Sequence, residues 1–320
     1  MTVIQVTGGV PLKGEVRVTG AKNSVLKLMA AAILAPGRTV ITRVPEILDV
    51  TIMSELLRRL GCDVEHDTVA ETVTIDVPEE MEHRADYDLV RQMRASICVL
   101  GPLVTRIGAA DVAMPGGDAI GSRGLDFHVQ GLRKLGAIVE SDHGYLVATA
   151  PNGLHGASVY LDFPSVGATE TVLMAAVLAK GVTVIDNAAR EPEIIDICEM
   201  LIAMGANIAG VGTSTLEITG VDALHPVTHA TVPDRIVAGT WAVAATMTQG
   251  DVFIRDAVGS HMDLPLSKLS DAGADIEVAF DGVRVSMDKR PSAIDIVTLP
   301  YPGFPTDLQP QFIALNSIAD

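Results

Sequence analysis

Apolar residues gather in short runs of helical length, each of which ends near a glycine and continues into a strand-like segment. Four such runs are LMAAAILAPGRTVI, CVLGPLVTRIGAADVAM, LMAAVLAKGVTVI and AVAATMTQGDVFI, with turn glycines at Gly37, Gly108, Gly181 and Gly250. These glycines lie about 70 residues apart, and a constant spacing of this kind indicates an internally repeated architecture. A fifth unit opens at FPTDLQPQFIALNSIAD, so we expect the 320-residue chain to stop inside a repeat.

Each repeat has a second half, in which another helix is followed by a glycine and a strand. The pattern predicts these helices at 47–61, 125–136, 193–205 and 262–273, ending at Gly61, Gly136, Gly205 and Gly273. A glycine suits the left-handed residue that closes many helices. Apolar residues between Ile194 and Leu201 recur at helical spacing, and alternating segments such as TVTIDV and VRVSM predict strands. The repeat is therefore a small α/β unit.

Composition limits the class of protein. Hydrophobic residues make up 48% of the chain and aromatic residues only 3%, so Ala, Val, Leu, Ile and Met must build the cores. A chain of this length favours two domains over one large core. The apolar runs are too short for a membrane span, and the N-terminus lacks the pattern of a signal peptide.

The cysteines and the net charge narrow the partners. Cys62, Cys98 and Cys198 lie in apolar helical contexts without metal-ligand spacing, which favours reduced core thiols in a cytoplasmic protein. A net charge of −17 argues against a nucleic-acid or membrane-surface partner. It leaves an anionic small substrate open, because local basic groups decide that question.

The loop PGGDAIGSRGLD, at 115–126, is the densest chemical signal. Its glycines allow backbone N–H groups to approach a ligand closely. Asp118 lies at its tip, and Arg123 follows just before a predicted helix, where an anion would meet both the guanidinium and the helix N-terminus. A plain surface loop is the alternative interpretation, but the carboxylate and arginine inside a segment that breaks the repeat favour a functional one.

Polar residues also stand at the start of successive apolar helices. Lys22 and Asn23 open one helix, although the helix dipole disfavours a lysine in a first turn. Arg94, Ser165 and Asp307 begin three others. Each alone would be read as a solvated helix end or, for Asp307, as an N-cap. Their equivalent positions in successive repeats suggest that these helix ends converge on one site.

These residues fall within a set of motifs that resembles the enolpyruvyl transferases. The matching stretches are GAKNS, MRAS followed by LGPLV, PGGDAIGSR, SVGAT, NAAREPEI, DRI and FPTD. They run in the family's order along essentially the whole chain. The resemblance implies an inside-out α/β barrel fold, built from βαβαββ repeats in two domains.

The family pattern also predicts the domain boundaries. Residues 21–234 should form a first domain of three repeats, and residues 1–20 with 235–320 a second domain that is incomplete at its C-terminus. The family's late arginine, which helps to clamp phosphoenolpyruvate, falls in the absent part of the pattern. We expect the 320-residue form to be poorly stable or inactive unless the remainder is supplied, because unpaired apolar helix faces would be exposed.

The resemblance implies transfer of the enolpyruvyl group from phosphoenolpyruvate to the 3′-hydroxyl of UDP-N-acetylglucosamine, with release of phosphate, in the first committed step of peptidoglycan synthesis. It assigns no metal and no cofactor. Lys22 and Arg123 match the family's phosphoenolpyruvate-binding cations. Asp118 holds the proton-donor position, which many members fill with cysteine, and Asp307 matches the base on the hydroxyl side. This is general acid–base catalysis combined with electrostatic stabilisation.

The resemblance also predicts which residues bind the nucleotide sugar. They are Asn23, Arg94, Arg123, Gly124, Leu125, Asp126, Phe127, Phe163, Pro164, Ser165, Val166 and Asp307. Two of them depart from the family pattern. Phe163 stands where many members have a lysine, and Gly124 where many have a proline, so recognition of the diphosphate and the loop geometry should differ there.

Three alternatives remain at this stage. A sister transferase that acts on shikimate 3-phosphate shares the repeat, although SVGAT, AAREPEI and PGGDAIGSR favour the nucleotide sugar. A non-catalytic homologue would have lost Lys22, Arg123 or Asp307, all of which are present. RNA 3′-phosphate cyclase has similar repeats, but the acidic balance speaks against it. As a further hypothesis, a two-domain enzyme of this kind should close on its nucleotide sugar.

Overall fold

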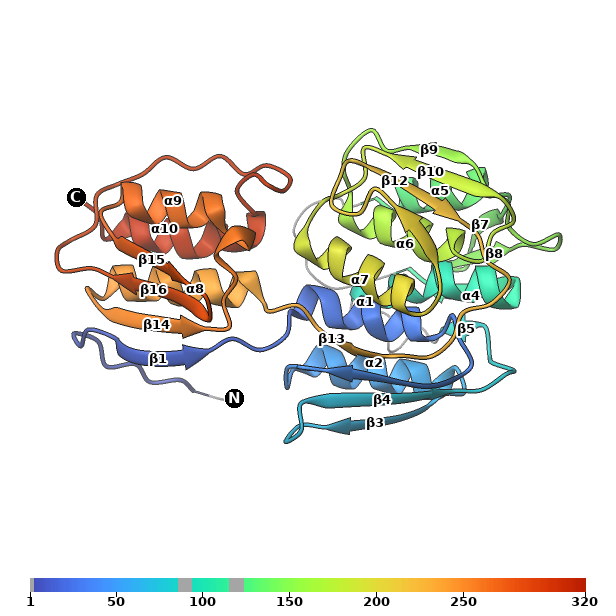
Figure 1. Ribbon diagram of the computed structural model, residues 1–320, viewed down its shortest axis with the longest axis horizontal. Helices are drawn as coiled ribbons and strands as arrows, with labels where there is room; N and C mark the ends of the chain where they lie inside the picture. The colour runs from blue at the N-terminus through green and yellow to red at the C-terminus, as the bar shows by residue number, and fades with distance from the viewer. Residues whose placement is uncertain (1–2, 86–93, 115–123) are drawn as a thin grey trace. The chain divides into compact units, whose positions relative to one another are not determined.

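The computed structural model describes residues 3–85, 94–114 and 124–320, and for residues 94–96 the backbone alone. The chain divides into two compact units, one made of Met1–Thr19 with Pro233–Asp320 and the other of Gly20–Val232. Both units are mixed α/β structures, and each sheet that the described residues form has four strands (Figure 1). The chain passes from the smaller unit to the larger at Thr19 and returns at Val232.

The first repeat of the larger unit contains two helices and four strands. They are α1 (Lys22–Ala32), β2 (Gly37–Thr42), α2 (Leu48–Arg59), β3 (Asp63–Asp67), β4 (Thr72–Val77) and β13 (Thr228–Ala230). Their sheet has the order β13-β2-β4-β3. β13 pairs with β2 in parallel, with Thr228 opposite Val40, whereas β2, β4 and β3 are antiparallel. A strand from the end of the unit therefore completes the repeat at its beginning.

The second and third repeats follow the same plan. The second contains β5 (Arg84–Ala85), η1 (Arg94–Val99), α4 (Leu100–Ile107), β6 (Ala109–Ala113), α5 (Asp126–Lys134), β7 (Ile138–Asp142) and β8 (Tyr145–Thr149). The third contains β9 (Ser158–Tyr160), α6 (Val166–Ala176), β10 (Val182–Asp186), α7 (Pro192–Ala203), β11 (Asn207–Ala209) and β12 (Thr215–Thr219). The sheet orders are β5-β6-β8-β7 and, in the opposite direction, β11-β12-β10-β9. Both match that of the first repeat, since β5 and β9 take the edge position that β13 has there.

The smaller unit contains one further repeat of this kind. Its elements are β1 (Lys13–Arg17), α8 (Arg235–Met247), β14 (Asp251–Arg255), η2 (Gly259–His261), α9 (Asp263–Asp271), β15 (Asp275–Ala279) and β16 (Gly282–Ser286). The elements η3 (Thr306–Leu308) and α10 (Gln309–Ser317) follow it, in the segment where the sequence predicts that the next repeat opens. The sheet order is β1-β14-β16-β15, with β1 parallel to β14. Here too the edge strand is distant in sequence, because Lys13 pairs with Asp251.

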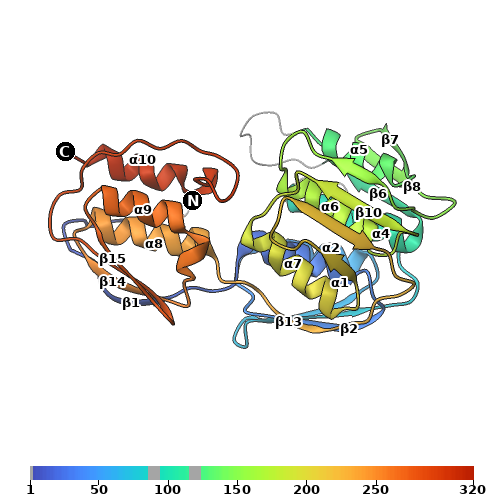
Figure 2. The ribbon, with the colours of Figure 1, turned by 45° about the horizontal axis from the view of Figure 1, so that its top comes forward.

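Helices occupy the interior of the larger unit, and the sheets cover its outside (Figure 2). The interior helices pack in pairs: α4 and α5 both contact α6, and α1 contacts α7. The core between them is aliphatic, as the composition predicted, and includes the fully buried Leu28, Met29, Leu103 and Leu173. This arrangement brings the beginnings of helices from different repeats into one unit.

The predicted turn glycines are confirmed. The glycines that close the second helices have φ values of 103°, 96°, 106° and 104° at Gly61, Gly136, Gly205 and Gly273, in the left-handed region. At the end of α8 the left-handed residue is instead Gln249, with φ of 52°. Gly250 is required for close packing, because a Cβ there would lie 2.2 Å from the carbonyl oxygen of Leu12. Gly250 therefore lies at the predicted turn between α8 and β14, where close packing requires a glycine.

The three cysteines are free and buried, as predicted. Burial raises the pKa of the thiols of Cys62, Cys98 and Cys198 to about 12. A thiol with so high a pKa carries almost no thiolate at neutral pH and is chemically inert. Among the described residues, no helix combines the length and apolar character that crossing a bilayer requires.

Candidate functional site

Lys22 is the first residue of α1 and carries an exposed cation at the helix start. Its Nζ lies 3.3 Å from Oδ2 of Asp49, and the two side chains are 53% and 29% exposed. Asp49 lies in the first turn of α2, where the helix dipole favours a carboxylate. The pair therefore joins two helix beginnings within one repeat. No sequence pattern selected Asp49, although it stands in the predicted helix 47–61.

The first turn of α1 is also tied to the third repeat through a buried carboxylate. Asp196 on α7 is 4% exposed and accepts hydrogen bonds from the hydroxyl of Ser24 and from the backbone N–H of Val232, the latter at 3.1 Å. Its other oxygen lies 2.7 Å from Nε2 of His229 on β13. One carboxylate thus fixes α1, α7 and the segment that leaves the unit. The quoted NAAREPEI motif ends at Ile194, two residues before Asp196, so the sequence argument missed this group.

The turn Phe163–Val166 leads directly into α6. Ser165 is the N-cap of this helix, and its hydroxyl accepts a hydrogen bond of 3.3 Å from the backbone N–H of Ala168. A serine in this position stabilises the helix start by about 1 kcal/mol, so Ser165 has a structural role whether or not it binds a ligand. Phe163 is 54% exposed and presents its ring where the family pattern has a lysine.

The described part of the glycine-rich loop resumes at Gly124 and enters α5 at Asp126. Asp118 and Arg123 lie outside the described residues. Arg94 is the first residue of η1, and its side chain is likewise outside the description. The structure therefore describes the backbone of Arg94 but not its side chain. The positions of the Arg94, Asp118 and Arg123 side chains stay predictions.

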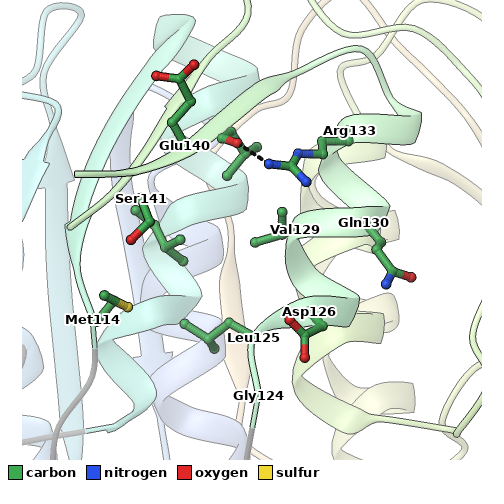
Figure 3. Close-up of a pocket in the computed structure, with 11 residues that line it drawn as sticks. Met114, Gly124, Leu125, Asp126, Val129, Gln130, Arg133, Glu140 and Ser141 are labelled. Carbon is green, nitrogen blue, oxygen red and sulfur yellow. Dashed lines mark hydrogen bonds between the residues drawn. The ribbon is translucent and has the colours of Figure 1, made fainter. Parts of the chain in front are cut away.

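A cavity of about 530 Å³ lies between α5 and the sheet that contains β7 and β8 (Figure 3). Gly124, Leu125 and Asp126 line it at one end. Arg133 lies near the end of α5 and donates a hydrogen bond of 2.5 Å to the carbonyl of Val139. The cavity brings together three of the predicted substrate-binding residues. Phe127 does not line it but packs against the core of the larger unit.

Asp307 belongs to the smaller unit, where it lies in η3 and is exposed. The residues that precede η3 and α10 as caps are Pro305 and Leu308, so Asp307 is the N-cap of neither helix. Buried aromatic packing fixes this turn, because the rings of Phe304 and Phe312 meet edge to face at 4.8 Å. The N-cap interpretation of Asp307 is therefore wrong, and its carboxylate lies on a turn that is packed on both sides by buried rings.

Repeated βαβαββ units with interior helices and outer sheets define the architecture of the enolpyruvyl transferases. Two solved structures share it, although their low identity makes this a likeness of fold alone. The enolpyruvyl transferase NikO from Streptomyces tendae matches with a TM-score of 0.86 and 24% identity, over 98% of this chain and 74% of that one. An EPSP synthase from Acinetobacter baumannii matches with a TM-score of 0.70 and 18% identity, over 96% and 70%.

Sequence comparison establishes the family. Residues 6–320 match the model of the EPSP synthase (3-phosphoshikimate 1-carboxyvinyltransferase) family, and the chain belongs to this family. It is also similar to proteins named UDP-N-acetylglucosamine 1-carboxyvinyltransferase. That of Nocardia farcinica is 59% identical over 98% of this chain and 75% of the relative. That of Corynebacterium jeikeium is 58% identical over the same shares, and that of Mycobacterium tuberculosis 56%.

The comparisons confirm the predicted family, fold class and enzyme class. The chain is a transferase of the carboxyvinyl type and spans about three quarters of the length of these curated relatives. The roles of individual side chains are tested by none of these comparisons. They stay predictions, and the described geometry supports some of them more than others.

Proposed function

We propose that the protein transfers the enolpyruvyl group of phosphoenolpyruvate to the 3′-hydroxyl of UDP-N-acetylglucosamine and releases phosphate, in the first committed step of peptidoglycan synthesis. The carrying observation is the identity of 56–59% to relatives named for this activity, over 98% of the chain. We place the reaction in the cytoplasm, which agrees with three buried free thiols.

The geometry of Lys22 supports its proposed role. Phosphoenolpyruvate carries a phosphate and a carboxylate, and both need cations or N–H donors. The half-exposed ammonium of Lys22 is fixed at a helix start by Asp49. An incoming anion would there meet a charge-assisted hydrogen bond and the positive end of the α1 dipole. Arg123 is proposed to supply the second cation.

The proposed chemistry uses two carboxyl groups. Asp118 donates a proton to the methylene carbon of phosphoenolpyruvate, while the sugar hydroxyl attacks the neighbouring carbon and gives its proton to Asp307. Asp307 then passes its proton to the departing phosphate, and Asp118 takes a proton back from the new methyl group, which forms the enol ether and restores both carboxyl groups. A carboxyl group ordinarily ionises near pH 4, and an approaching phosphate dianion favours its protonated form. The exposed carboxylate of Asp307 is the group proposed to accept the hydroxyl proton.

We propose that the nucleotide sugar is held by Asn23, by Arg94, by the segment Arg123–Phe127 and by the turn Phe163–Val166. The exposed ring of Phe163 supplies an apolar face in place of an ammonium. Recognition of the diphosphate must therefore come from the arginines and from backbone N–H groups. The cavity beside Gly124–Asp126 has a volume within the range of small-molecule sites.

The test is release of phosphate from phosphoenolpyruvate by protein expressed from its complete open reading frame. UDP-N-acetylglucosamine and shikimate 3-phosphate serve as acceptors in parallel, because the family model carries the name of the shikimate enzyme. Release with the nucleotide sugar alone is the expected result, and Asp118→Asn should then abolish it. Release with shikimate 3-phosphate alone would replace the proposed acceptor, and release with neither would favour a non-catalytic homologue.

A further inference from the structure

The core of the larger unit contains an ion pair that connects two repeats. Glu170 on α6 has a side chain 1% exposed, and its Oε1 lies 3.3 Å from Nζ of Lys27 on α1, whose side chain is 12% exposed. The same ammonium donates a hydrogen bond of 2.5 Å to the backbone carbonyl of Asn23. A single cation therefore joins the first turn of α1 to a carboxylate in the middle of a neighbouring helix.

This pair is expensive to bury. Moving two charges out of water costs several kcal/mol for each ion, and the pair repays this only when further hydrogen bonds satisfy it. Apart from the contact with Lys27, neither carboxylate oxygen of Glu170 is satisfied by a hydrogen bond within the described residues. In other proteins, replacing such a pair by well-packed apolar side chains of similar volume often costs no stability. The pair is poorly explained as a stabilising device alone.

The first turn of α1 lacks the usual devices that hold a helix start. Its N-cap is Ala21, which offers no side-chain hydrogen bond, and the turn contains no acidic residue. Side chains in a helix lean toward its N-terminus, so Lys27 reaches back to the level of Asn23. The Lys27 bond and the Ser24–Asp196 bond help to anchor this turn, together with the bond from the Ala21 N–H to the carbonyl of Val232 and the exposed Lys22–Asp49 pair.

We propose that Lys27 and Glu170 are positioning residues for the transferase reaction. Glu170 holds the ammonium of Lys27 in place, and Lys27 holds the carbonyl of Asn23. The pair thereby fixes the turn that presents Lys22 and Asn23 to phosphoenolpyruvate and the nucleotide sugar. This inference rests on the proposed function, since it assigns an indirect role at the same site.

Three variants test the proposal in the full-length protein. Lys27→Met removes the ammonium and keeps the length of the side chain, and Glu170→Gln removes the charge and keeps the shape. The double variant Lys27→Met/Glu170→Leu replaces the pair by apolar groups. We expect kcat/KM to fall about 100-fold in Lys27→Met, since misplacement of a site by about 1 Å has an effect of that size. Glu170→Gln should lose about tenfold.

The double variant separates positioning from stability. It should have a melting temperature near that of the wild type, because no buried charge is left unpaired. Its kcat/KM should nevertheless remain about 100-fold low, with kcat affected as well as the KM for phosphoenolpyruvate. Recovery of both the melting temperature and kcat/KM in the double variant would overturn the proposal. This comparison also holds if Lys27→Met folds poorly.

A second measurement needs no turnover. Amide hydrogen exchange of residues 23–28, without substrates, should accelerate at least about tenfold in Lys27→Met and in the double variant, because the turn opens more often. Thr105→Val is the matched control. It removes a 2.8 Å hydrogen bond from α4 to the carbonyl of Ala175 on α6 and leaves the α1 turn untouched. Unchanged exchange in both Lys27 variants would overturn the proposal. Absence of turnover in the wild type with accelerated exchange would instead refute only the proposed function.

Discussion

The ammonium of Lys22 and the carboxylate of Asp49 lie 3.3 Å apart, across the beginnings of α1 and α2. Both side chains are partly exposed, so the pair itself contributes less than about 1 kcal/mol to stability. Its consequence is geometric. Asp49 holds a flexible four-carbon side chain at one place, and this limits where the cation can meet a substrate anion.

Lys22→Met should therefore remove activity without unfolding the protein. We expect kcat/KM to fall by about 1,000-fold, the loss typical of one strong electrostatic contact to a developing charge. Asp49→Asn should reduce it about tenfold, mainly through the KM for phosphoenolpyruvate. Melting temperatures should change little in either variant. Arg38→Gln, which removes an exposed pair with Asp76 on a distant strand pair, is the control. An equal loss of activity in Arg38→Gln would contradict the specific role of Lys22.

Asp196 should be the more important carboxylate for stability. Asp196→Ala leaves the Ser24 hydroxyl, the His229 ring and the Val232 N–H without their buried acceptor. Breaking such a network costs about 3 kcal/mol, to be measured as a lower midpoint of urea unfolding at unchanged slope.

Two substitutions control for this effect. Asp196→Asn keeps the shape and one acceptor oxygen, so it should cost less than the alanine. Ser54→Ala removes a buried hydroxyl that bonds only its own helix, at 2.8 Å from the carbonyl of Val50, and should cost less than about 1 kcal/mol. A midpoint for Asp196→Ala no lower than that of Ser54→Ala would contradict the network.

The repeat, the helix ends and the fold class could be predicted because each depends on local patterns. The strand Thr72–Val77 and the glycine ends of the second helices follow from alternation and from the need for positive φ. Gly250 lies at its predicted turn, but the sequence could not show why a glycine is needed there: Gln249 takes the left-handed conformation, and Gly250 is in close contact with the distant Leu12. A contact across more than 200 residues leaves no local pattern.

The site was predicted less completely for the same reason. Lys22, Ser165 and Asp307 were found because they begin helices in successive repeats or match a motif. Asp49 and Asp196 act through partners on other elements, and Glu170 stands within an apolar helix where the sequence shows an isolated charge. The partners of these carboxylates become visible only in the folded structure, where α1 packs against η1 and α7 and where Lys27 contacts α6.

Glu170 should make stability depend on pH near neutrality. Burial is the main cause that raises the pKa of this carboxyl to about 7, the negative Glu193 and Glu191 add to it, and Lys27 opposes it. Between pH 4.5 and 7 the folded state keeps a proton that the unfolded state has lost. The contribution of Glu170 to the free energy of unfolding is therefore fully present below about pH 4.5 and is lost as the pH rises through 7.

Unfolding measured from pH 5 to 8 should show this loss as a difference from Glu170→Gln, which cannot titrate. We expect the wild type to lose up to about 3 kcal/mol relative to the variant over this range. The Cys98 thiol also faces this carboxyl. Neither this thiol nor the Lys27 ammonium changes its charge between pH 5 and 8, because the pKa of the thiol is raised by burial and the pKa of the amine is raised as well. Parallel curves for the two proteins would show that Glu170 is ionised throughout.

The protein should be intrinsically insensitive to fosfomycin, which inhibits enolpyruvyl transferases by alkylating a cysteine at the proton-donor position. The resemblance predicts Asp118 at that position, and a carboxylate attacks the epoxide far more slowly than a thiolate does. The only cysteines of the sequence are Cys62, Cys98 and Cys198, which are buried and have a pKa raised to about 12. None of these three thiols can therefore react with fosfomycin in place of a cysteine at the proton-donor position.

Preincubation with fosfomycin should leave both the activity and the intact mass unchanged over hours. A thiol reagent should label none of the three cysteines in the native protein and all of them after unfolding. Asp118→Cys is the positive control, since it should acquire time-dependent inactivation together with a single mass adduct in the peptide 115–126. An adduct in that same peptide of the wild type would mean that Asp118 is reactive, and it would reverse the prediction.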